Sequence, residues 1–447
     1  MKTANVRELA VDALMSIEKN QAYSNLLLNT TIQKSNLSSK DVSLFTELVY
    51  GTLQRKITLD YYLEPFTSKA KKMELWVRIL LRMSLYQMIY LDRIPERAIF
   101  FEAVEISKKK GHKGIAGFVN GVLRAVQREG VPSLNEIEDP IERLALETSH
   151  PVWLVKKWAD QYGLDDTQKM CEVHMKPPVA SARVNRMHLT VEEAVAGLAE
   201  ESFDAARGVL SEDAVILKRG NISKSRLYKA GKLSIQDESS MLTARAVSPA
   251  KNEVVLDACA APGGKSLHMA ELMEGTGEIV SLDLHKHKVK LIEEQAERAG
   301  LHNISPQVMD AREAPLELSG IQFDKILVDA PCSGFGVIRR KPDIKYAKNA
   351  NDVNRLSAIQ QELLDSVSRL LKKGGTLVYS TCTIDKEENE EVIADFLASH
   401  PEFEEDHSLK QLLPEKVHPY INGGKLQILP HYFETDGFFI TRLKKKV

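Results

Sequence analysis

The sequence predicts a multidomain protein with an all-α N-terminal domain, a small α+β middle subdomain and a C-terminal doubly wound α/β domain. Three observations support this prediction. Helical apolar spacing alone runs through the first 130 residues, a short strand–helix pattern follows a Pro-Pro break, and strands alternate with helices from Glu253 onward. We predict a helical domain over 1–130, a linker over 131–150, the subdomain over 151–232 and the α/β domain over 233–447.

The helical domain is predicted from apolar stripes that step by three and four residues within 6–17, 75–86 and 115–126. A basic turn at residues 108–113 (Lys-Lys-Lys-Gly-His-Lys) is either a solvated loop or a phosphate contact. The predicted linker contains Pro132 and Pro140 with several acids, a composition that is typical of loops.

The middle subdomain is predicted from an alternating strand at 179–184 and a helix at 191–198. Residues 218–232 then hold six Lys or Arg residues and no acid, so they favour contacts with nucleic-acid phosphates. Low aromatic content gives no support for a base-stacking sheet.

In the α/β domain we expect strands at 254–257, 278–283, 305–309, 323–329 and 376–380, and helices at 264–273, 285–299, 354–371 and 387–397. The alternation predicts a mostly parallel, Rossmann-like sheet. A closing strand pair at 426–429 and 437–443 is typical of methyltransferases rather than of dinucleotide-binding folds.

The turn after the first of these strands, Cys259 to Lys265, suggests a ligand site. A phosphate-binding P-loop would need glycine where Cys259 stands, and the dinucleotide fingerprint G-x-G-x-x-G is absent. A pocket for S-adenosylmethionine tolerates small residues here and places an acid, Asp283, after the second strand for the ribose hydroxyls. The remaining alternative is a turn that only reverses the chain.

Three of the four cysteines, Cys259, Cys332 and Cys382, directly follow predicted strands, whereas Cys171 lies in a helical stretch and is interpreted as packing. A thiolate that adds to C6 of a pyrimidine makes C5 nucleophilic enough to accept a methyl group. The same step needs an acid near cytosine N3, a role that suits Asp329. No Cys/His group has zinc spacing, so we expect no metal.

The composition indicates how the protein can bind nucleic acid and in which compartment it is expected. The formal net charge is −2, so nucleic-acid binding must come from local basic patches. The charged N-terminal stretch is not expected to be a signal peptide, and no apolar run approaches the length of a membrane span. We therefore expect a cytoplasmic protein with free thiols and no membrane partner, and a monomer because no coiled-coil pattern is found.

Several motifs together resemble those of the RNA cytosine-5 methyltransferases. They are residues 236–240 (Gln-Asp-Glu-Ser-Ser), 257–265, 329–334 (Asp-Ala-Pro-Cys-Ser-Gly), 380–382 (Ser-Thr-Cys) and 436–439 (Asp-Gly-Phe-Phe). In addition, residues 102–108 and 118–124 resemble part of the helical RNA-binding antitermination factor NusB. The resemblance covers essentially the whole chain and implies a NusB-like front joined to a methyltransferase that uses S-adenosylmethionine.

The resemblance implies methyl transfer to C5 of a specific cytosine in 16S ribosomal RNA of the small subunit. Residue chemistry alone leaves the two cysteines unassigned; the resemblance makes Cys382 the nucleophile toward C6, Cys332 the group that assists release, and Asp329 a contact to cytosine and cofactor. The implied cofactor residues are Cys259, Ala260, Ala261, Pro262, Gly263, Gly264, Lys265, Asp283, Asp310 and Asp329. Asp310 has a helix cap or solvated turn acid as its alternative.

Other functions stay open at this point. A transfer-RNA cytosine-5 methyltransferase shares the chemistry, and a non-catalytic NusB-like RNA-binding or antitermination factor shares the front. A nucleoside-triphosphate hydrolase is the weakest alternative, because the first P-loop glycine is missing. Residues 339–341 (Arg-Arg-Lys) are expected to flank an RNA channel together with 218–232.

Overall fold

The computed structural model describes residues 5–20, 24–35, 37–68, 70 and 72–447, so the first four residues of the predicted helical domain lie outside it. The chain divides into two compact units. The first comprises Met1–Lys176 with Arg340–Ala347, and the second Pro177–Arg339 with Lys348–Val447. The chain therefore leaves the second unit once, between β8 (Phe323–Asp329) and α18 (Ala350–Val367), and then returns to it.

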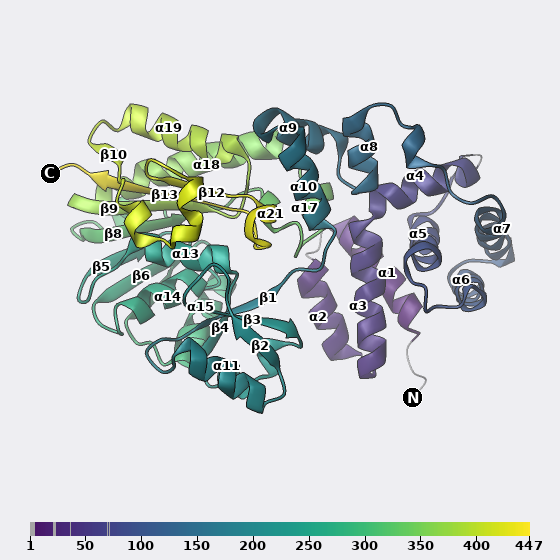
Figure 1. The fold of residues 1–447 in the computed structure, drawn as a ribbon, viewed down its shortest axis with the longest axis horizontal. Helices are drawn as coiled ribbons and strands as arrows, with labels where there is room; N and C mark the ends of the chain where they lie inside the picture. Colours follow the sequence, from purple (N-terminus) through teal and green to yellow (C-terminus); the bar gives the residue numbers. More distant parts are fainter. Residues whose placement is uncertain (1–4, 21–23, 36, 69, 71) are drawn as a thin grey trace. The chain divides into compact units, whose positions relative to one another are not determined.

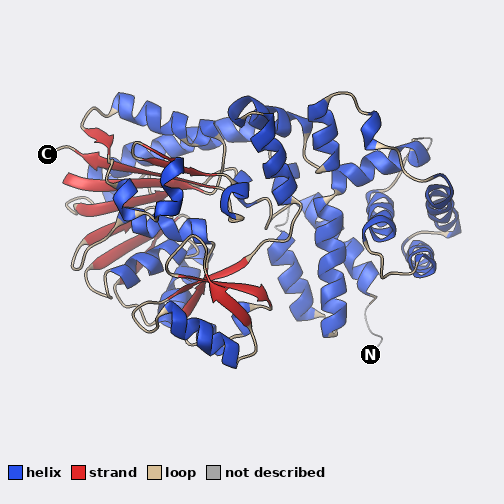
Figure 2. Ribbon diagram, viewed as in Figure 1, coloured by secondary structure: helices blue, strands red, loops and turns tan. Residues whose placement is uncertain are grey.

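The first unit is helical in the part that the structure describes, as Figures 1 and 2 show. Its elements are α1 (Val6–Asn20), α2 (Ser24–Lys34), α3 (Ser39–Gln54), α4 (Lys56–Thr67), α5 (Leu75–Tyr90), α6 (Glu96–Lys110), α7 (Lys113–Glu129), η1 (Leu134–Glu136), α8 (Pro140–Glu147), α9 (Val152–Tyr162), α10 (Leu164–His174) and α17 (Ile344–Ala347).

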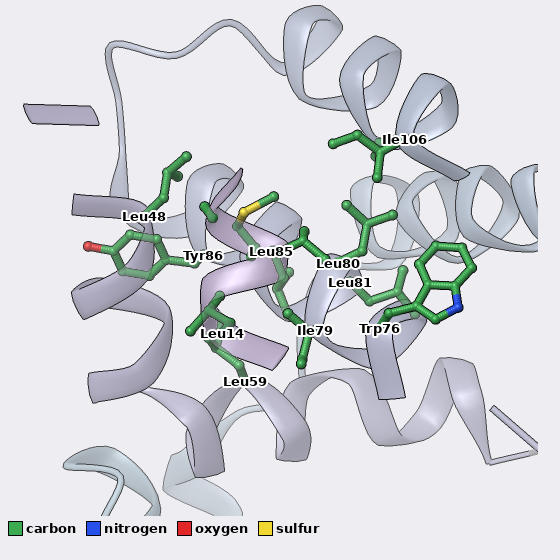
Figure 3. Close-up of a cluster of buried hydrophobic side chains, with 14 of the residues drawn as sticks. Leu14, Leu48, Leu59, Trp76, Ile79, Leu80, Leu81, Leu85, Tyr86 and Ile106 are labelled. Atoms are coloured by element: carbon green, nitrogen blue, oxygen red, sulfur yellow. The ribbon is translucent and has the colours of Figure 1, made fainter. Parts of the chain in front are cut away.

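Helix α5 lies at the centre of this unit, because it is buried on nearly all sides from Trp76 to Gln87. Figure 3 shows its side chains, among them Leu80 and Leu85, packed with leucines from α1, α3 and α4. The one buried cation of α5, Arg82, donates to Glu18 and to Asp60, each at 2.6 Å, so the charge is compensated inside the core.

The segment expected as a linker, 131–150, instead contains η1 and α8. Asp139 caps α8 by accepting from the N–H groups of Ile141 and Glu142, and Pro140 occupies the first helical turn. Helices α9 and α10, expected in the middle subdomain, pack on each other and α9 packs on α8, so they join the helical unit. Buried Trp158 contributes to this packing. The exact domain boundaries stay predictions.

The second unit begins with a small antiparallel sheet in the order β2-β3-β1-β4. Its elements are β1 (Ala180–Val184), α11 (Val191–Glu200), β2 (Asp204–Arg207), β3 (Ala214–Arg219), η2 (Ile222–Lys224), α12 (Arg226–Lys229) and β4 (Leu233–Ile235). Helix α11 packs its buried residues Val191, Ala194 and Leu198 on this sheet. The predicted α+β subdomain is thereby found.

The large sheet runs in the order β11-β12-β13-β9-β8-β5-β6-β7, with β10 also pairing β13. Figure 2 shows the strands of the two sheets in red. Its strands are β5 (Val254–Asp257), β6 (Glu278–Asp283), β7 (Ile304–Val308), β8, β9 (Leu371–Thr381), β10 (Phe403–Glu405), β11 (Ile421–Asn422), β12 (Lys425–Ile428) and β13 (Phe438–Lys445). Strands β5 to β9 are mutually parallel, and β13 lies antiparallel to β9 and to β12. The closing antiparallel pair matches the expectation for a methyltransferase sheet.

Helices cover both faces of this sheet. They are α13 (Glu238–Val247), α14 (Gly264–Leu272), α15 (Lys286–Ala299), α16 (Ala314–Glu317), α18, η4 (Ser368–Leu370), α19 (Glu390–Ser399), α20 (Leu409–Leu412) and α21 (Pro430–Phe433), with 3-10 turns η3 (Phe335–Val337), η5 (Lys386–Glu388) and η6 (Glu415–Tyr420). Alternate strand residues point to opposite faces. Leu377 and Tyr379 of β9 therefore join a cluster with α18 and α19, seen along one face in Figure 1, whereas Val378 joins one with α13 and α14.

Across the described residues, no helix is both long enough and apolar enough to cross a membrane.

Candidate active site

The carboxyl ends of the parallel strands β5, β6, β7, β8 and β9 form one edge of the large sheet, where ligands bind in open α/β folds. A cavity of about 460 Å³ opens at this edge. It is lined by Ala258, Cys259, Ala261, Asp283, Leu284, His285, Lys288, Met309, Asp310, Ala311, Arg312, Asp329, Ala330, Pro331, Cys332, Ile359, Leu363 and Cys382. The structure thus brings residues from five separate strand ends, those of β5 to β9, to a single cavity.

Two sulfur atoms meet at the cavity wall. The Sγ atoms of Cys332 and Cys382 lie 3.4 Å apart, and both residues are half-buried. Behind them, the Ser333 and Thr383 hydroxyls form a hydrogen bond of 2.8 Å between the same two loops. The hydrogen bond with Cys382, together with burial, raises the pKa of the Cys332 thiol, so Cys332 favours its protonated form.

A pair of glycines brings the backbone close to the Cys382 loop. The N–H of Gly336 donates to the Cys382 carbonyl at 3.0 Å, and the N–H of Gly437 donates to the Gly336 carbonyl at 2.9 Å. A Cβ atom on Gly336 would come within 2.0 Å of the Gly437 carbonyl oxygen. Only glycine fits this approach, which explains why residues 436–439 belong to the site's framework.

Asp329 at the end of β8 is held by two donors. Its Oδ2 accepts from Lys265 Nζ at 2.7 Å, and its Oδ1 accepts from the Ser380 hydroxyl at 2.8 Å. Burial lowers the pKa of Lys265, but the neighbouring Asp329 carboxylate raises it, and the net direction is upward. Lys265 also lies 5.2 Å from the centre of the Phe438 ring. The cation is therefore fixed beside Asp329 and stays charged.

Of the predicted cofactor residues, Cys259, Ala261, Asp283, Asp310 and Asp329 line the cavity. Asp283 accepts from the His285 N–H at 3.0 Å through Oδ1. Burial, and then the nearby carboxylates of Asp257 and Asp329, raise the pKa of the Cys259 thiol, which makes Cys259 a poor nucleophile.

Asp310 is an acid of the turn after β7, and its carboxylate lies at the cavity wall. Its Oδ1 accepts from the Arg312 N–H at 3.0 Å, as a turn acid does, and its Oδ2 accepts from the Arg312 guanidinium at 2.7 Å. These hydrogen bonds with Arg312 lower the pKa of Asp310. The carboxylate also reaches the cavity, so the turn holds a charged group at its wall.

The other predicted cofactor residues, Ala260, Pro262, Gly263, Gly264 and Lys265, are not among the lining residues. They build the turn that carries Cys259 and Ala261. The Gly263 N–H donates to the Ala260 carbonyl at 2.8 Å with a φ of +105°, a conformation that favours glycine. Helix α14 begins at Gly264, whose carbonyl accepts from buried Arg183 of β1 at 2.9 Å.

Asp257, the last residue of β5, is fully buried. Its Oδ2 accepts from the Ser266 hydroxyl at 2.6 Å, within the same strand–turn–helix step. Burial raises its pKa to about 7, against the lowering effect of Ser266. It supports the turn below the cavity rather than lining it.

The cavity fits a nucleoside bearing an amino-acid chain. Its volume lies in the range of small-ligand sites, and it combines apolar walls from Met309, Ile359 and Leu363 with the carboxylates of Asp283 and Asp310. Carboxylate oxygens accept from ribose hydroxyls and amines, which suits S-adenosylmethionine. Within the described residues, no group of three or more His, Cys, Asp or Glu side chains is arranged to hold a metal ion.

The basic residues predicted near RNA separate into two kinds. Lys218, Arg219, Lys224, Arg226 and Lys229 are exposed on the small subdomain. Arg339, in contrast, is 8% exposed and donates to the carbonyls of Glu434 at 2.8 Å and Pro177 at 2.6 Å. The expectation that Arg339 flanks an RNA channel is therefore not met, because its guanidinium is used inside the fold.

Sequence reasoning missed the residues that support the two cysteine loops, namely Gln360, Glu388 and Asn389, all of which are fully buried. The available signal was a Glu-Glu-Asn-Glu run at 387–390, directly after the Cys382 segment. That run was interpreted only as the start of a helix, because acidic and amide residues are ordinary in a first helical turn.

Comparisons with known proteins agree with this architecture. The family model described as 16S rRNA methyltransferase RsmB/F matches residues 244–444, a NusB family model matches 4–128, and a ferredoxin-like domain model of RsmF/B-like methyltransferases matches 150–222. These matches confirm the three predicted fold classes.

Whole-chain relatives match as well. The chain is 58% identical over 446 residues to the probable ribosomal RNA small subunit methyltransferase B of Bacillus subtilis, covering 100% of both chains. It is 34% identical to the ribosomal RNA small subunit methyltransferase B of Shewanella oneidensis, covering 99% of each. The crystal structure of PH0851 superposes with a TM-score of 0.85 at 27% identity, covering 99% of both chains.

Proposed function

Because the chain belongs to the family of 16S rRNA methyltransferases RsmB/F, we propose that it methylates C5 of a specific cytosine through a covalent cysteine–C6 intermediate. Family membership confirms the predicted enzyme class, an rRNA methyltransferase that uses S-adenosylmethionine. Two parts of the proposal do not follow from family membership: that cytosine C5 receives the methyl group, and that the reaction passes through a covalent intermediate.

The observation that carries the proposal is the pair of sulfurs 3.4 Å apart at the wall of a nucleoside-sized cavity. Bound S-adenosylmethionine supplies an electrophilic methyl group on a sulfonium centre. Cytosine C5 is a weak nucleophile, and a thiolate bonded to C6 makes it enamine-like. Two thiols in contact suit a reaction in which one sulfur bonds the ring and the other assists its release.

We assign Cys382 as the sulfur that bonds C6. Cys332 then assists removal of the C5 proton, after which the bond between C6 and sulfur breaks. The raised pKa of Cys332 keeps its thiol protonated while Cys382 attacks C6. On release, Cys332 gives this proton to the departing Cys382 sulfur, 3.4 Å away, and takes up the C5 proton in its place. Asp329 lines the same cavity as the two cysteines and would orient the cytosine and the cofactor, with Lys265 and Ser380 holding its two oxygens in place.

The remaining cofactor assignments follow the lining of the cavity. Asp283 would accept from the ribose hydroxyls, Asp310 would lie at the adenine side, and Cys259 with Ala261 would border the methionine part. Ala260, Pro262, Gly263 and Gly264 would act through the shape of the turn.

The RNA partner is proposed to be small-subunit ribosomal RNA, in the cytoplasm where ribosomal RNA is processed. The exposed basic residues within 218–232 would contact phosphates, which gives affinity without sequence information. The target cytosine must leave its stack to reach the sulfurs at the cavity wall.

Incubation with tritiated S-adenosylmethionine and unmodified RNA tests the proposal. Label in 5-methylcytidine of digested 16S rRNA is the expected result. Label in transfer RNA would favour the transfer-RNA enzyme, and RNA binding without any label would favour the antitermination-type factor. Label at another cytosine atom would contradict the covalent route.

A further inference from the structure

We propose that two adjacent buried residues, Glu388 and Asn389, are positioning residues that separately hold the two sulfur-bearing loops. Glu388 fixes the Cys332 loop and Asn389 fixes the Cys382 loop. The proposal rests on the proposed cysteine chemistry and adds to it the elements that set the relation between the two sulfurs.

Glu388 holds the Cys332 loop through its backbone. Its Oε1 accepts from the Ser333 N–H at 2.8 Å and from Gln360 Nε2 at 3.1 Å. The same Gln360 nitrogen donates to the Pro331 carbonyl at 2.9 Å. The peptide groups on both sides of Cys332 are therefore tied to a single carboxyl oxygen, directly or through one amide, so the position of the Cys332 sulfur depends on this acceptor.

Asn389 holds the other loop from both sides of Cys382. Its Oδ1 accepts from the Thr381 hydroxyl at 2.6 Å, and its Nδ2 donates to the Thr383 carbonyl at 3.1 Å. The same nitrogen donates to Gln427 Oε1 of β12 at 3.2 Å. Asn389 begins α19 without a side-chain capping bond, so its amide serves the loop instead of its own helix.

The two residues share one anchor. The backbone carbonyl of Glu388 accepts from the Tyr379 hydroxyl at 2.6 Å, and Tyr379 is a fully buried residue of β9. The pair Glu388 and Asn389 is thus attached to β9, the strand that leads into Cys382, while its two side chains reach both loops. A rigid attachment of this kind keeps reacting groups within the narrow tolerance that catalysis requires.

Glu388 acts here through its acceptor oxygen. Its Oε2 is buried and has no hydrogen-bond partner among the described residues. Burial raises the pKa of Glu388 to about 7, against the lowering effect of its bonds to Ser333, so the neutral acid is readily formed. Glutamine keeps one carbonyl oxygen as the acceptor for Ser333 and Gln360, so it should hold the Cys332 loop in place. Its buried amide nitrogen lacks a partner and costs some stability.

The test compares variants in single-turnover reactions with 16S rRNA, following both the covalent protein–RNA adduct on denaturing gels and 5-methylcytidine. Glu388→Ala and Glu388→Asp, which remove or withdraw the acceptor, should slow adduct breakdown at least tenfold and leave adduct formation within threefold. Glu388→Gln should restore both rates to within threefold of the parent. Asn389→Ala should instead slow adduct formation at least tenfold.

Glu391→Ala, an exposed position on the same helix α19, is the matched control and should behave as the parent. Binding of S-adenosylhomocysteine by each variant reports on the intact cavity, and it should stay within threefold. A purely structural role would lower both rates together and would not be rescued by glutamine.

The outcomes separate this proposal from the proposed function. A parent enzyme that forms no adduct defeats the covalent chemistry itself. A competent parent whose Glu388 and Asn389 variants share one defect, or show none, overturns the division between the two loops. If Glu388 variants instead slowed adduct formation and the Asn389 variant slowed adduct breakdown, the step assigned to each residue would be wrong.

Discussion

The protein holds its cysteine thiols in two contrasting environments. Cys171 lies in the helical unit, fully buried, and burial raises the pKa of its thiol to about 12, against the lowering effects of Thr148 and Lys345. Cys332 and Cys382 lie at strand ends of the other unit, half-buried and open to a cavity. The same residue type therefore packs in one place and faces a ligand site in the other.

The difference teaches that the location of a thiol, and not its identity, sets its chemical use. A thiol within packed helices cannot meet a substrate and acts as a small apolar group. A thiol at the carboxyl edge of a parallel sheet lies where helix N-termini and loops leave space for ligands. Substitutions of these cysteines, and of Lys345 in the helical unit, test the contrast between the buried thiol and the two thiols at the cavity.

The largest effect is expected at Cys382. Cys382→Ser should lower turnover by about 10⁴-fold or more, because a hydroxyl is far less nucleophilic than a thiolate at neutral pH. No covalent adduct should form with RNA, whereas binding of S-adenosylmethionine should persist. Turnover near the parent value would remove Cys382 from the nucleophile's role.

Cys332→Ala is expected to lower turnover by about 10²- to 10³-fold, the size of a lost proton-transfer group. The covalent adduct should accumulate, because Cys382 still bonds C6 while release is impaired. A slowly migrating band on a denaturing gel is the readout. Accumulation in Cys382 variants instead would reverse the two assignments.

The free energy of unfolding should depend on pH through Lys345, a buried lysine of the helical unit. Lys345 is fully buried and donates to the carbonyls of Gln54 at 3.0 Å and Thr148 at 3.5 Å. Burial lowers its pKa to about 7 from 10.5, although Cys171 acts to raise it.

Between those two pKa values the unfolded chain binds a proton that the folded chain lacks. Stability should therefore rise with pH from about 7 upward, by at most about 1.4 kcal/mol per pH unit. Lys345→Met should remove this slope, measured as urea-unfolding midpoints at pH 7, 8 and 9. Parallel pH curves for parent and variant would contradict the buried neutral lysine.

The smallest effect is expected at Cys171. Cys171→Ala should destabilise the protein by about 1 kcal/mol, because it leaves a small void among packed helices. Methyl transfer and adduct formation should match the parent within twofold. A large loss of activity with unchanged unfolding would break the contrast between the two kinds of thiol.

Much of the fold follows from local patterns in the sequence. The strands at 254–257, 278–283 and 323–329 match β5, β6 and β8 residue for residue, because buried parallel strands are short, mostly apolar runs. Each of these three runs also ends in an aspartate, which marks its last residue. The segment 131–150 was less predictable. Its prolines and acids indicated a linker, yet Asp139 and Pro140 start a helix there, since proline at the first turn favours both outcomes.

The sequence by itself determined which chemistry the chain carries: two thiols, an acid and a small-residue turn, each directly after a strand. Tertiary structure alone decided how these groups meet, because distances between loops depend on strand order and on partners far away in the chain. The contact between Cys332 and Cys382, the withdrawal of Arg339 into the fold and the roles of Gln360, Glu388 and Asn389 are of this kind. Residue type is encoded locally, whereas hydrogen-bond partnership is a property of the folded chain.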